Sequence, residues 1–191
     1  VGNYEKFGNS VALNNDGNRV VIGSPVNNGV GYVSVYDYDT NGWIQKGSVI
    51  KIGNNSESGY SVAMNTSGSR IVIGVPQSDN VGFVRVYDYI DNSWESVGNI
   101  IEGSQDKEKF GHSVAMSSDG ERIVIGAPQN NDNKGAVRVY ELRDSSWNKL
   151  GSDDIKGTAD EDNFGYSVDI NNDGNKIVVG APQNNPSKGY V

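Results

Sequence analysis

The stretch of sequence that decides the fold runs from Phe110 to Pro128 and reads FGHSVAMSSDGERIVIGAP. The same pattern occurs four times, beginning near residues 7, 58, 110 and 164. Its equivalent serines are Ser10, Ser61, Ser113 and Ser167. A period of about 50 residues is typical of an array of supersecondary units, each stabilised by its neighbours.

Each copy predicts four short antiparallel strands joined by tight turns. In the first copy, residues 10–13 form a strand of small residues, and Asn15-Asp16-Gly17 is a strong hairpin signal. Residues 19–22 are an apolar run rich in β-branched residues, which predicts a strand buried on both faces. Residues 31–36 alternate as a half-buried strand does, and residues 43–50 form a fourth, outer strand.

Four-stranded units of this length indicate the blades of a β-propeller. Small side chains in the first strand suit the crowded axis, and the tyrosines and tryptophans of the outer strands suit the wide periphery. We therefore predict an all-β fold: a β-propeller-type array of four-stranded antiparallel blades, in one repeat region spanning residues 1–191. An open β-solenoid is the alternative, although its repeats are usually about 20–30 residues long.

Both ends of the array are expected to be incomplete blades. The chain begins partway through a repeat, and the fourth copy stops at Gly189-Tyr190-Val191, where its third strand opens. We expect a segment of a longer propeller, closed by further blades from the same chain or by another copy. A closed four-bladed ring is the alternative.

Composition excludes several classes of function. The formal net charge is −8, so the basic surface that nucleic-acid binding requires is absent, and an anionic membrane would repel the chain. There are no cysteines, which excludes disulfides, thiolate metal sites and cysteine nucleophiles. No apolar run approaches the roughly 20 residues of a membrane helix, so no membrane insertion is expected.

The repeated motif resembles the FG-GAP repeat family, known from the N-terminal propeller of integrin α chains. Phe7-Gly8, Phe110-Gly111 and Phe164-Gly165 supply the "FG", while Ser58 replaces the phenylalanine in the second copy. Gly126-Ala127-Pro128 and Gly180-Ala181-Pro182 supply the "GAP", with Gly23-Ser24-Pro25 and Gly74-Val75-Pro76 as near matches. The resemblance implies a propeller fold, and its members range over adhesion, recognition, structural arrays and some enzymes.

The resemblance also implies a calcium cage in the hairpin between the first two strands, built on oxygen ligands at alternate positions. Here that cage is degraded. Only the fourth copy keeps three ligand positions, Asp169, Asn171 and Asp173, and Ile177 replaces the last aspartate. The sequence therefore suggests calcium at this hairpin as a candidate metal, with a plain turn without metal as the alternative. No other cofactor is predicted.

Catalytic candidates are few. His112 is the single histidine, and its counterparts are Asn9, Tyr60 and Tyr166, so we interpret it as a polar residue at a blade edge. Asp160-Glu161-Asp162 could chelate a cation or act as paired carboxylates, but we expect a solvated loop. We predict that the protein is not an enzyme.

Two further groups of residues are candidate sites. The first group could form a sugar-binding aromatic platform, but its regular recurrence favours packing of the outer strands in every blade. Its members are Tyr36, Tyr38, Tyr87, Tyr89, Tyr140, Trp43, Trp94 and Trp147. The second comprises Asn54 and Asn65, which stand in N-glycosylation sequons.

The leading hypothesis is an extracellular or cell-surface β-propeller scaffold for adhesion or protein–protein recognition. It would bind a protein or glycan through variable loops on one rim, at residues 26–30, 77–81, 129–134 and 183–188. One alternative is a structural subunit of an extracellular filament or sheath, assembling with further copies. Another is the non-catalytic propeller part of a larger secreted enzyme.

Overall fold

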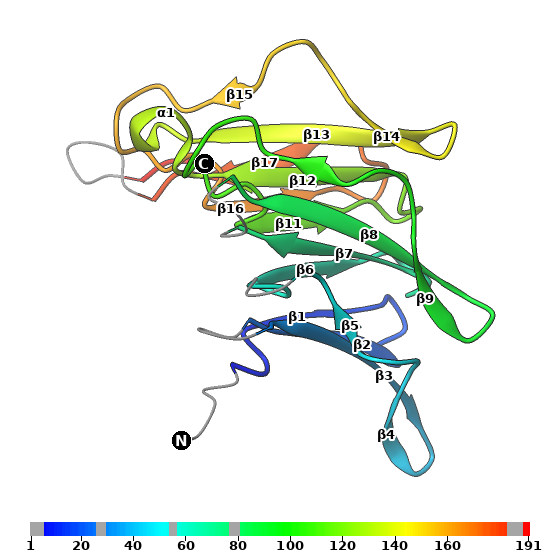
Figure 1. Cartoon of the computed structure of the whole chain (residues 1–191). Helices are drawn as coiled ribbons and strands as arrows, with labels where there is room; N and C mark the ends of the chain where they lie inside the picture. Colours follow the sequence, from blue (N-terminus) through cyan, green and yellow to red (C-terminus); the bar gives the residue numbers. More distant parts are fainter. Residues whose placement is uncertain (1–5, 26–29, 54–56, 77–80, 183–188) are drawn as a thin grey trace, which may run out of the picture.

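The protein consists of four antiparallel sheets stacked in sequence order (Figure 1). The computed structural model describes residues 6–25, 30–53, 57–76, 81–182 and 189–191. The first sheet contains β1 (Ser10–Leu13), β2 (Arg19–Ser24), β3 (Tyr32–Asp39), β4 (Gly42–Gln45) and β5 (Ile50–Lys51). The second contains β6 (Ser61–Met64), β7 (Arg70–Val75), β8 (Phe83–Ile90), β9 (Ser93–Ser96) and β10 (Ile101–Glu102).

The third sheet contains β11 (Ser113–Met116), β12 (Arg122–Ala127), β13 (Ala136–Arg143), β14 (Ser146–Lys149) and β15 (Ile155–Lys156). The fourth contains β16 (Ser167–Ile170) and β17 (Ile177–Gly180). One helical turn, α1 (Asn130–Asn133), precedes β13. In the part of the chain that the structure describes, no helix is long and apolar enough to cross a membrane.

Each of the first three sheets is the predicted meander, with one difference in its outer strand. The expected strand over residues 43–50 is broken into β4 and β5, which both pair with β3. Residues 46–49 bulge out between them, opposite only two residues of β3, and Gly47 has a φ of 73°. A bulge of this kind bends the strand and increases its twist.

The four sheets are arranged as blades. Their first strands contact one another in succession, β1 with β6, β6 with β11 and β11 with β16, so these strands form the inner edge of the array. The outer strands and their turns spread away from this edge (Figure 1). The predicted all-β, β-propeller-type architecture is therefore confirmed.

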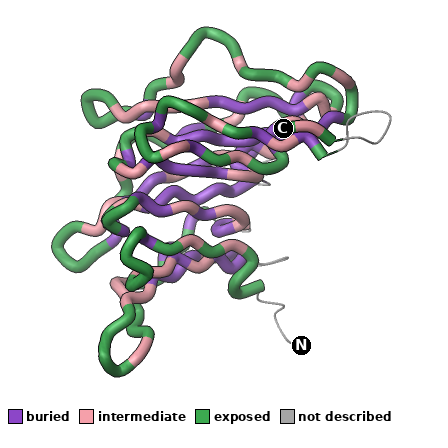
Figure 2. The backbone as a smooth tube through the Cα atoms, turned by 180° about the vertical axis from the view of Figure 1, so that it is seen from behind, coloured by how far each residue is buried: buried purple, intermediate pink, exposed green. Residues whose placement is uncertain are grey.

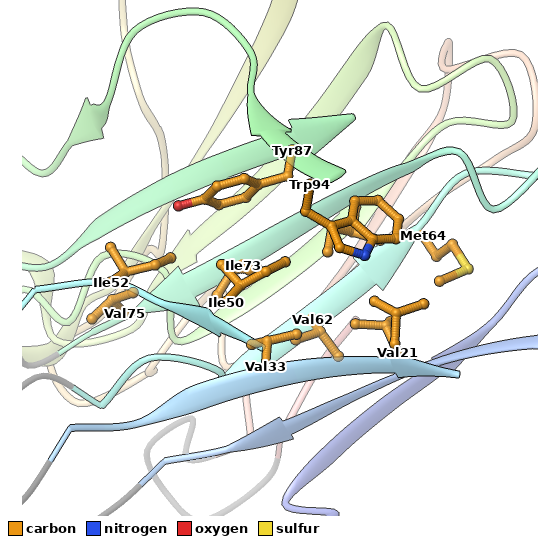
Figure 3. Packing of buried hydrophobic residues seen from close by; sticks show 12 residues of the cluster. Val21, Val33, Ile50, Ile52, Val62, Met64, Ile73, Val75, Tyr87 and Trp94 are labelled. Atoms are coloured by element: carbon orange, nitrogen blue, oxygen red, sulfur yellow. The ribbon is translucent and has the colours of Figure 1, made fainter. Parts of the chain in front are cut away.

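Three apolar clusters fill the spaces between successive sheets. The buried residues are concentrated along the stacked strands, and the turns are mostly exposed (Figure 2). In the first cluster, Val21 and Val33 of the first sheet face Val62 and Ile73 of the second (Figure 3). The central strands are buried on both faces: Ile71, Val72 and Ile73 are all fully buried. This is why β7 is an unbroken apolar run rather than an alternating one.

Hydrogen bonds join successive sheets at the edge where β2, β7 and β12 end, here called the loop rim. Ser10, Ser61 and Ser113 each donate from Oγ to the carbonyl oxygen of the glycine that precedes the next sheet by two residues. Those acceptors are Gly59, Gly111 and Gly165, each at 2.8 Å.

A second set joins the sheets at the opposite edge, the hairpin rim. The backbone N–H groups of Asn15, Thr66 and Ser118 donate to the carbonyls of Thr66, Ser118 and Asn172, respectively. Arg19, Arg70 and Arg122 each pair with a carboxylate on their own sheet and donate to a glycine carbonyl in the next hairpin. The sheets are thus fixed at both edges and by the apolar residues between them.

Candidate functional site: the loop rim and its inner edge

The loop rim of the third sheet carries a polar cleft of about 430 Å³. One wall is the linker segment Gln105, Asp106 and Lys107, and the other is the loop between β12 and β13. The loop contributes Gln129, Asn131, Asp132 and Asn133. The lining offers amide, carboxylate and ammonium groups, which suits hydrogen bonding more than apolar contact. This cleft coincides with the recognition loop predicted at residues 129–134; the predicted loops 26–30, 77–81 and 183–188 lie largely or wholly outside the described residues.

A buried ion pair between Glu108 and Arg138 lies next to the cleft. Glu108 is fully buried and Arg138 is 4% exposed. The guanidinium donates two hydrogen bonds to the Glu108 carboxylate, at 2.9 and 2.8 Å, and it also pairs with Asp154. Asn130 donates to the same carboxylate, which ties the loop to the linker. Burial alone would lower the pKa of the Arg138 guanidinium, but the bonds to Glu108 and Asp154 raise it, so the group is charged at every relevant pH.

The loop itself has an unusual backbone. Asn131, Asp132 and Asn133 have φ values of 49°, 56° and 65°, and Lys107 across the cleft has 63°. Asparagine and aspartate tolerate this left-handed region better than other residues with side chains, although it still carries strain. Neighbouring segments hold the loop in place: Asn163 donates its backbone N–H to Asn133, and Phe164 donates to Lys134.

The acidic stretch Asp160-Glu161-Asp162 is only partly the solvated loop that the sequence predicts. Asp160 is exposed and forms an ion pair with Lys134, but Asp162 is fully buried rather than solvated. Asp162 accepts hydrogen bonds from the backbone of Thr158 and Ala159 and from the hydroxyl of Tyr190. It is the counterpart of Glu108, so buried carboxylates organise two successive linkers. The sequence signal was their shared position two residues before an FG phenylalanine.

The inner edge of the loop rim carries a stack of rings that sequence reasoning missed. The ring of His112 lies between Tyr60 and Tyr166, with centroid distances of 5.1 and 4.7 Å. His112 Nδ1 donates to the carbonyl of Tyr166, and Nε2 therefore accepts from the Tyr60 hydroxyl, both at 3.2 Å. Burial lowers the pKa of His112, and the nearby charge of Lys109 lowers it further against the opposing effect of the Tyr166 carbonyl. These residues share one repeat position, which was the available signal.

The predicted calcium ligands lie in the β16–β17 hairpin. The side-chain oxygen of Asn171 accepts the backbone N–H groups of Asn175 and Lys176, at 3.0 and 2.8 Å. Asn14 and Asn65 close the first two hairpins in the same manner. Calcium binding by Asp169, Asn171 and Asp173 would need that oxygen to be shared, and it stays a prediction for calorimetric titration.

The aromatic residues mostly serve packing, as their recurrence favoured. Trp94 and Trp147 are buried, and each donates its indole N–H to a carbonyl of the preceding sheet, Lys46 and Val97 respectively. The rings of Tyr38 and Trp43 pack edge to face with their centroids 5.3 Å apart, but both side chains remain about half exposed. No continuous aromatic platform results among these residues.

The two sequons are placed differently. Asn65 is 6% exposed and its side chain closes the β6–β7 hairpin, so a glycan there would have to displace those contacts. Asn54 lies outside the described residues. Glycosylation at both stays a prediction.

The profile of the FG-GAP repeat family matches residues 102–140 and 152–191, which include most of the third sheet and both strands of the fourth. The chain carries FG-GAP repeats. In these FG-GAP repeats the glycine of "FG" places its carbonyl against the glycine of the preceding "GAP": a Cβ on Gly126 would lie 2.0 Å from the oxygen of Gly165. The motif therefore encodes the close contact between blades.

One curated relative is human integrin alpha-6, which is 38% identical over 106 residues. The match covers 49% of this chain and 9% of integrin alpha-6, so the chain corresponds to a small part of that protein.

Solved structures share the fold at low identity. A putative 6-phosphogluconolactonase from Bacteroides uniformis has a TM-score of 0.64 at 12% identity, covering 92% of this chain and 48% of its own. The putative 6-phosphogluconolactonase from Bacteroides fragilis has a TM-score of 0.63 at 14% identity, with the same coverage. The mitotic checkpoint complex includes a chain with a TM-score of 0.59 at 16% identity, covering 91% of this chain and 45% of its own. At these identities the likeness concerns the fold alone, and this chain spans about half the length of these structures.

Proposed function

We propose that this chain is a β-propeller scaffold of the cell surface or extracellular space that recognises a protein partner through its loop rim. The observation that supports this most is the polar cleft at residues 105–107 and 129–133, which stands on the buried Glu108–Arg138 pair. Loops carried by a rigid frame are the usual location of binding residues. The likeness to integrin alpha-6 supports the surface location and the non-enzymatic character.

The rigidity of the rim is central to this proposal. An ordered loop loses little conformational entropy when a partner binds, and this improves affinity without added contact area. Here both walls of the cleft are fixed: Asn130 contacts Glu108, and Asn133 accepts a hydrogen bond from the linker at Asn163. Mixed charges at the rim, Asp106, Lys107 and Asp132, can select a partner by charge pattern.

The test is a binding screen of the fluorescently labelled chain against an array of secreted and cell-surface proteins. Lys107→Glu and Asp132→Lys should weaken any specific signal by about tenfold or more, because they reverse charges in the cleft. Glu95→Lys is the matched control: it reverses an exposed charge on β9, in an outer strand. A screen without a specific binder, or binders that respond equally to all three variants, would contradict the proposal.

A further inference from the structure

Arg85 is a half-buried arginine on β8 whose charge has no partner. It lies opposite Ile73 of β7, in a sheet that has another sheet on either side. Within the described residues, its guanidinium forms no hydrogen bond, ion pair or cation–π contact. A guanidinium is charged at every relevant pH and carries five N–H donors, so a half-buried one calls for an acceptor.

The third sheet shows what this position does when partners are present. Arg138 occupies it on β13, opposite Ile125. Its guanidinium donates two hydrogen bonds to Glu108 and a third, at 2.9 Å, to Asp154. It also lies over the ring of Phe110, 5.0 Å from the centroid. An arginine at this position of the repeat therefore directs its planar fork towards carboxylates.

The second sheet lacks these partners. The matching strand register places Ile100 at the position of Asp154. In the sequence of the linker, Ser56 stands in place of Glu108, and residue 56 lies outside the described residues. Ser58 stands in place of the phenylalanine, and its hydroxyl is fully buried without a hydrogen-bond partner. The arginine has thus been kept while both carboxylate positions have become neutral.

Glu57 does not replace the missing carboxylates. It stands at the repeat position of Lys109, one residue beyond that of Glu108. Burial raises the pKa of the Glu57 carboxyl, and the charges that oppose this rise are those of Lys6 and Lys109. The described part of the linker therefore supplies no carboxylate to Arg85.

We propose that Arg85 forms a carboxylate-binding site, which receives an acidic side chain of a bound protein. The carboxylate takes the place that Glu108 and Asp154 hold around Arg138, and Ile100, which is 40% exposed, offers an apolar contact beside it. Arg85 lies two residues from the loop-rim end of β8, within reach of a protein docked at that rim. The site rests on the comparison of two sheets; only the source of the carboxylate rests on the proposed function.

Titration of the 191-residue chain with sodium acetate tests the site alone. Proton–nitrogen correlation spectra report the arginine Nε–H signals, and the signal lost in Arg85→Gln identifies Arg85. This signal should shift and saturate at millimolar acetate, whereas sodium chloride at the same ionic strength should produce no saturable shift. Acetate that does not saturate, or sulfate that binds more tightly than acetate, would overturn the assignment.

A second pair of variants tests whether the carboxylate occupies the predicted place. Ile100→Asp supplies a carboxylate at the position of Asp154, so it should pair with Arg85 and weaken acetate binding at least about tenfold. Val49→Asp is the matched control: Val49 is 39% exposed at the same position of the first sheet, where Ser34 replaces the arginine. Both positions are exposed, so the fold should tolerate either change. Equal affinity for acetate in the two variants would refute the site.

Proteins found in the array screen test the source of the carboxylate. Arg85→Gln should weaken their binding by about tenfold, because it leaves an acidic side chain without its partner. Arg143→Gln is the control, since it removes an arginine whose side chain is 63% exposed at the end of β13. Binders that tolerate Arg85→Gln while acetate still binds would overturn the role in docking and leave the site itself standing.

Discussion

The hydroxyl of Ser113 lies 2.8 Å from the carbonyl oxygen of Gly165 and joins the third sheet to the fourth. The same bond joins Ser10 to Gly59 and Ser61 to Gly111. Each serine therefore acts across an interface and not within its own sheet. We infer that the repeated serine and the two glycines of the motif are retained because together they set the distance between blades.

Replacing Ser113 with alanine should lower the free energy of unfolding by about 1 kcal/mol, because it removes a hydrogen bond and leaves a partly buried carbonyl without a partner. Ser167→Ala is the matched control, because in the described structure no following sheet meets Ser167. Urea denaturation followed by tryptophan fluorescence measures both. Equal losses in the two variants would show that the bond contributes nothing specific to the interface.

Gly126→Ala should cost about 3 kcal/mol, since the added Cβ would lie 2.0 Å from the backbone oxygen of Gly165 and would force the two sheets apart. Gly180→Ala is the control. The nearest atom to its Cβ is the Ser167 hydroxyl, at 2.4 Å, which can rotate away. Thermal denaturation should separate the two variants clearly, and a Gly126→Ala variant as stable as Gly180→Ala would refute the role given to the motif glycine.

Glu108→Ala should destabilise the fold by about 3–5 kcal/mol, because it removes one partner of a buried ion pair and leaves Arg138 with fewer acceptors. Asp160→Ala removes the surface partner of Lys134, where Asp160 is 75% exposed, and should cost less than about 1 kcal/mol. Chemical denaturation measures both changes. The Glu108 effect should persist at high salt, because buried pairs are screened weakly; a loss that disappears with added salt would contradict the buried pair.

His112 should make stability depend on pH below its ordinary pKa of 6.5. The folded state depresses the pKa of the ring, so on acidification the unfolded chain binds the proton first. Stability from this residue is therefore complete above about pH 6.5 and is lost as the pH falls through the folded-state pKa. Urea denaturation from pH 7.5 down to about 5.5 should show the decline in wild type but not in His112→Asn, which adopts the residue of the first repeat. Parallel curves for the two proteins would assign any decline to other groups.

Much of the fold could be predicted from the sequence. The four copies, their Asp-Gly turns (Ser-Gly in the second copy) and their apolar second strands depend on local chemistry that repeats about every 50 residues. The broken outer strand could not be predicted, because the bulge at residues 46–49 results from the bend required between the inner and outer parts of a twisted sheet.

The candidate site was predicted less well. The loop at residues 129–134 is a candidate because it varies between repeats, and its role in recognition stays a prediction. The stretch Asp160-Glu161-Asp162 is expected from the sequence to be solvated, whereas Asp162 is buried, as is its counterpart Glu108. Their burial depends on Arg138 in one case and on Tyr190 and backbone donors in the other. Arg138 lies 30 residues from Glu108 and Tyr190 lies 28 residues from Asp162, and composition carries no sign of these pairings.

The sequence by itself determined the strands, the turns and the repeating blade, because backbone propensity and apolar alternation act over a few residues. Only the tertiary structure decided which equivalent residues touch. Stacking brings positions about 50 residues apart into contact, so Tyr60, His112 and Tyr166 form one cluster and Ser113 reaches Gly165. The exposure of Val11 has the same origin, because this residue and its counterpart Val62 are exposed or buried according to whether another sheet lies against them.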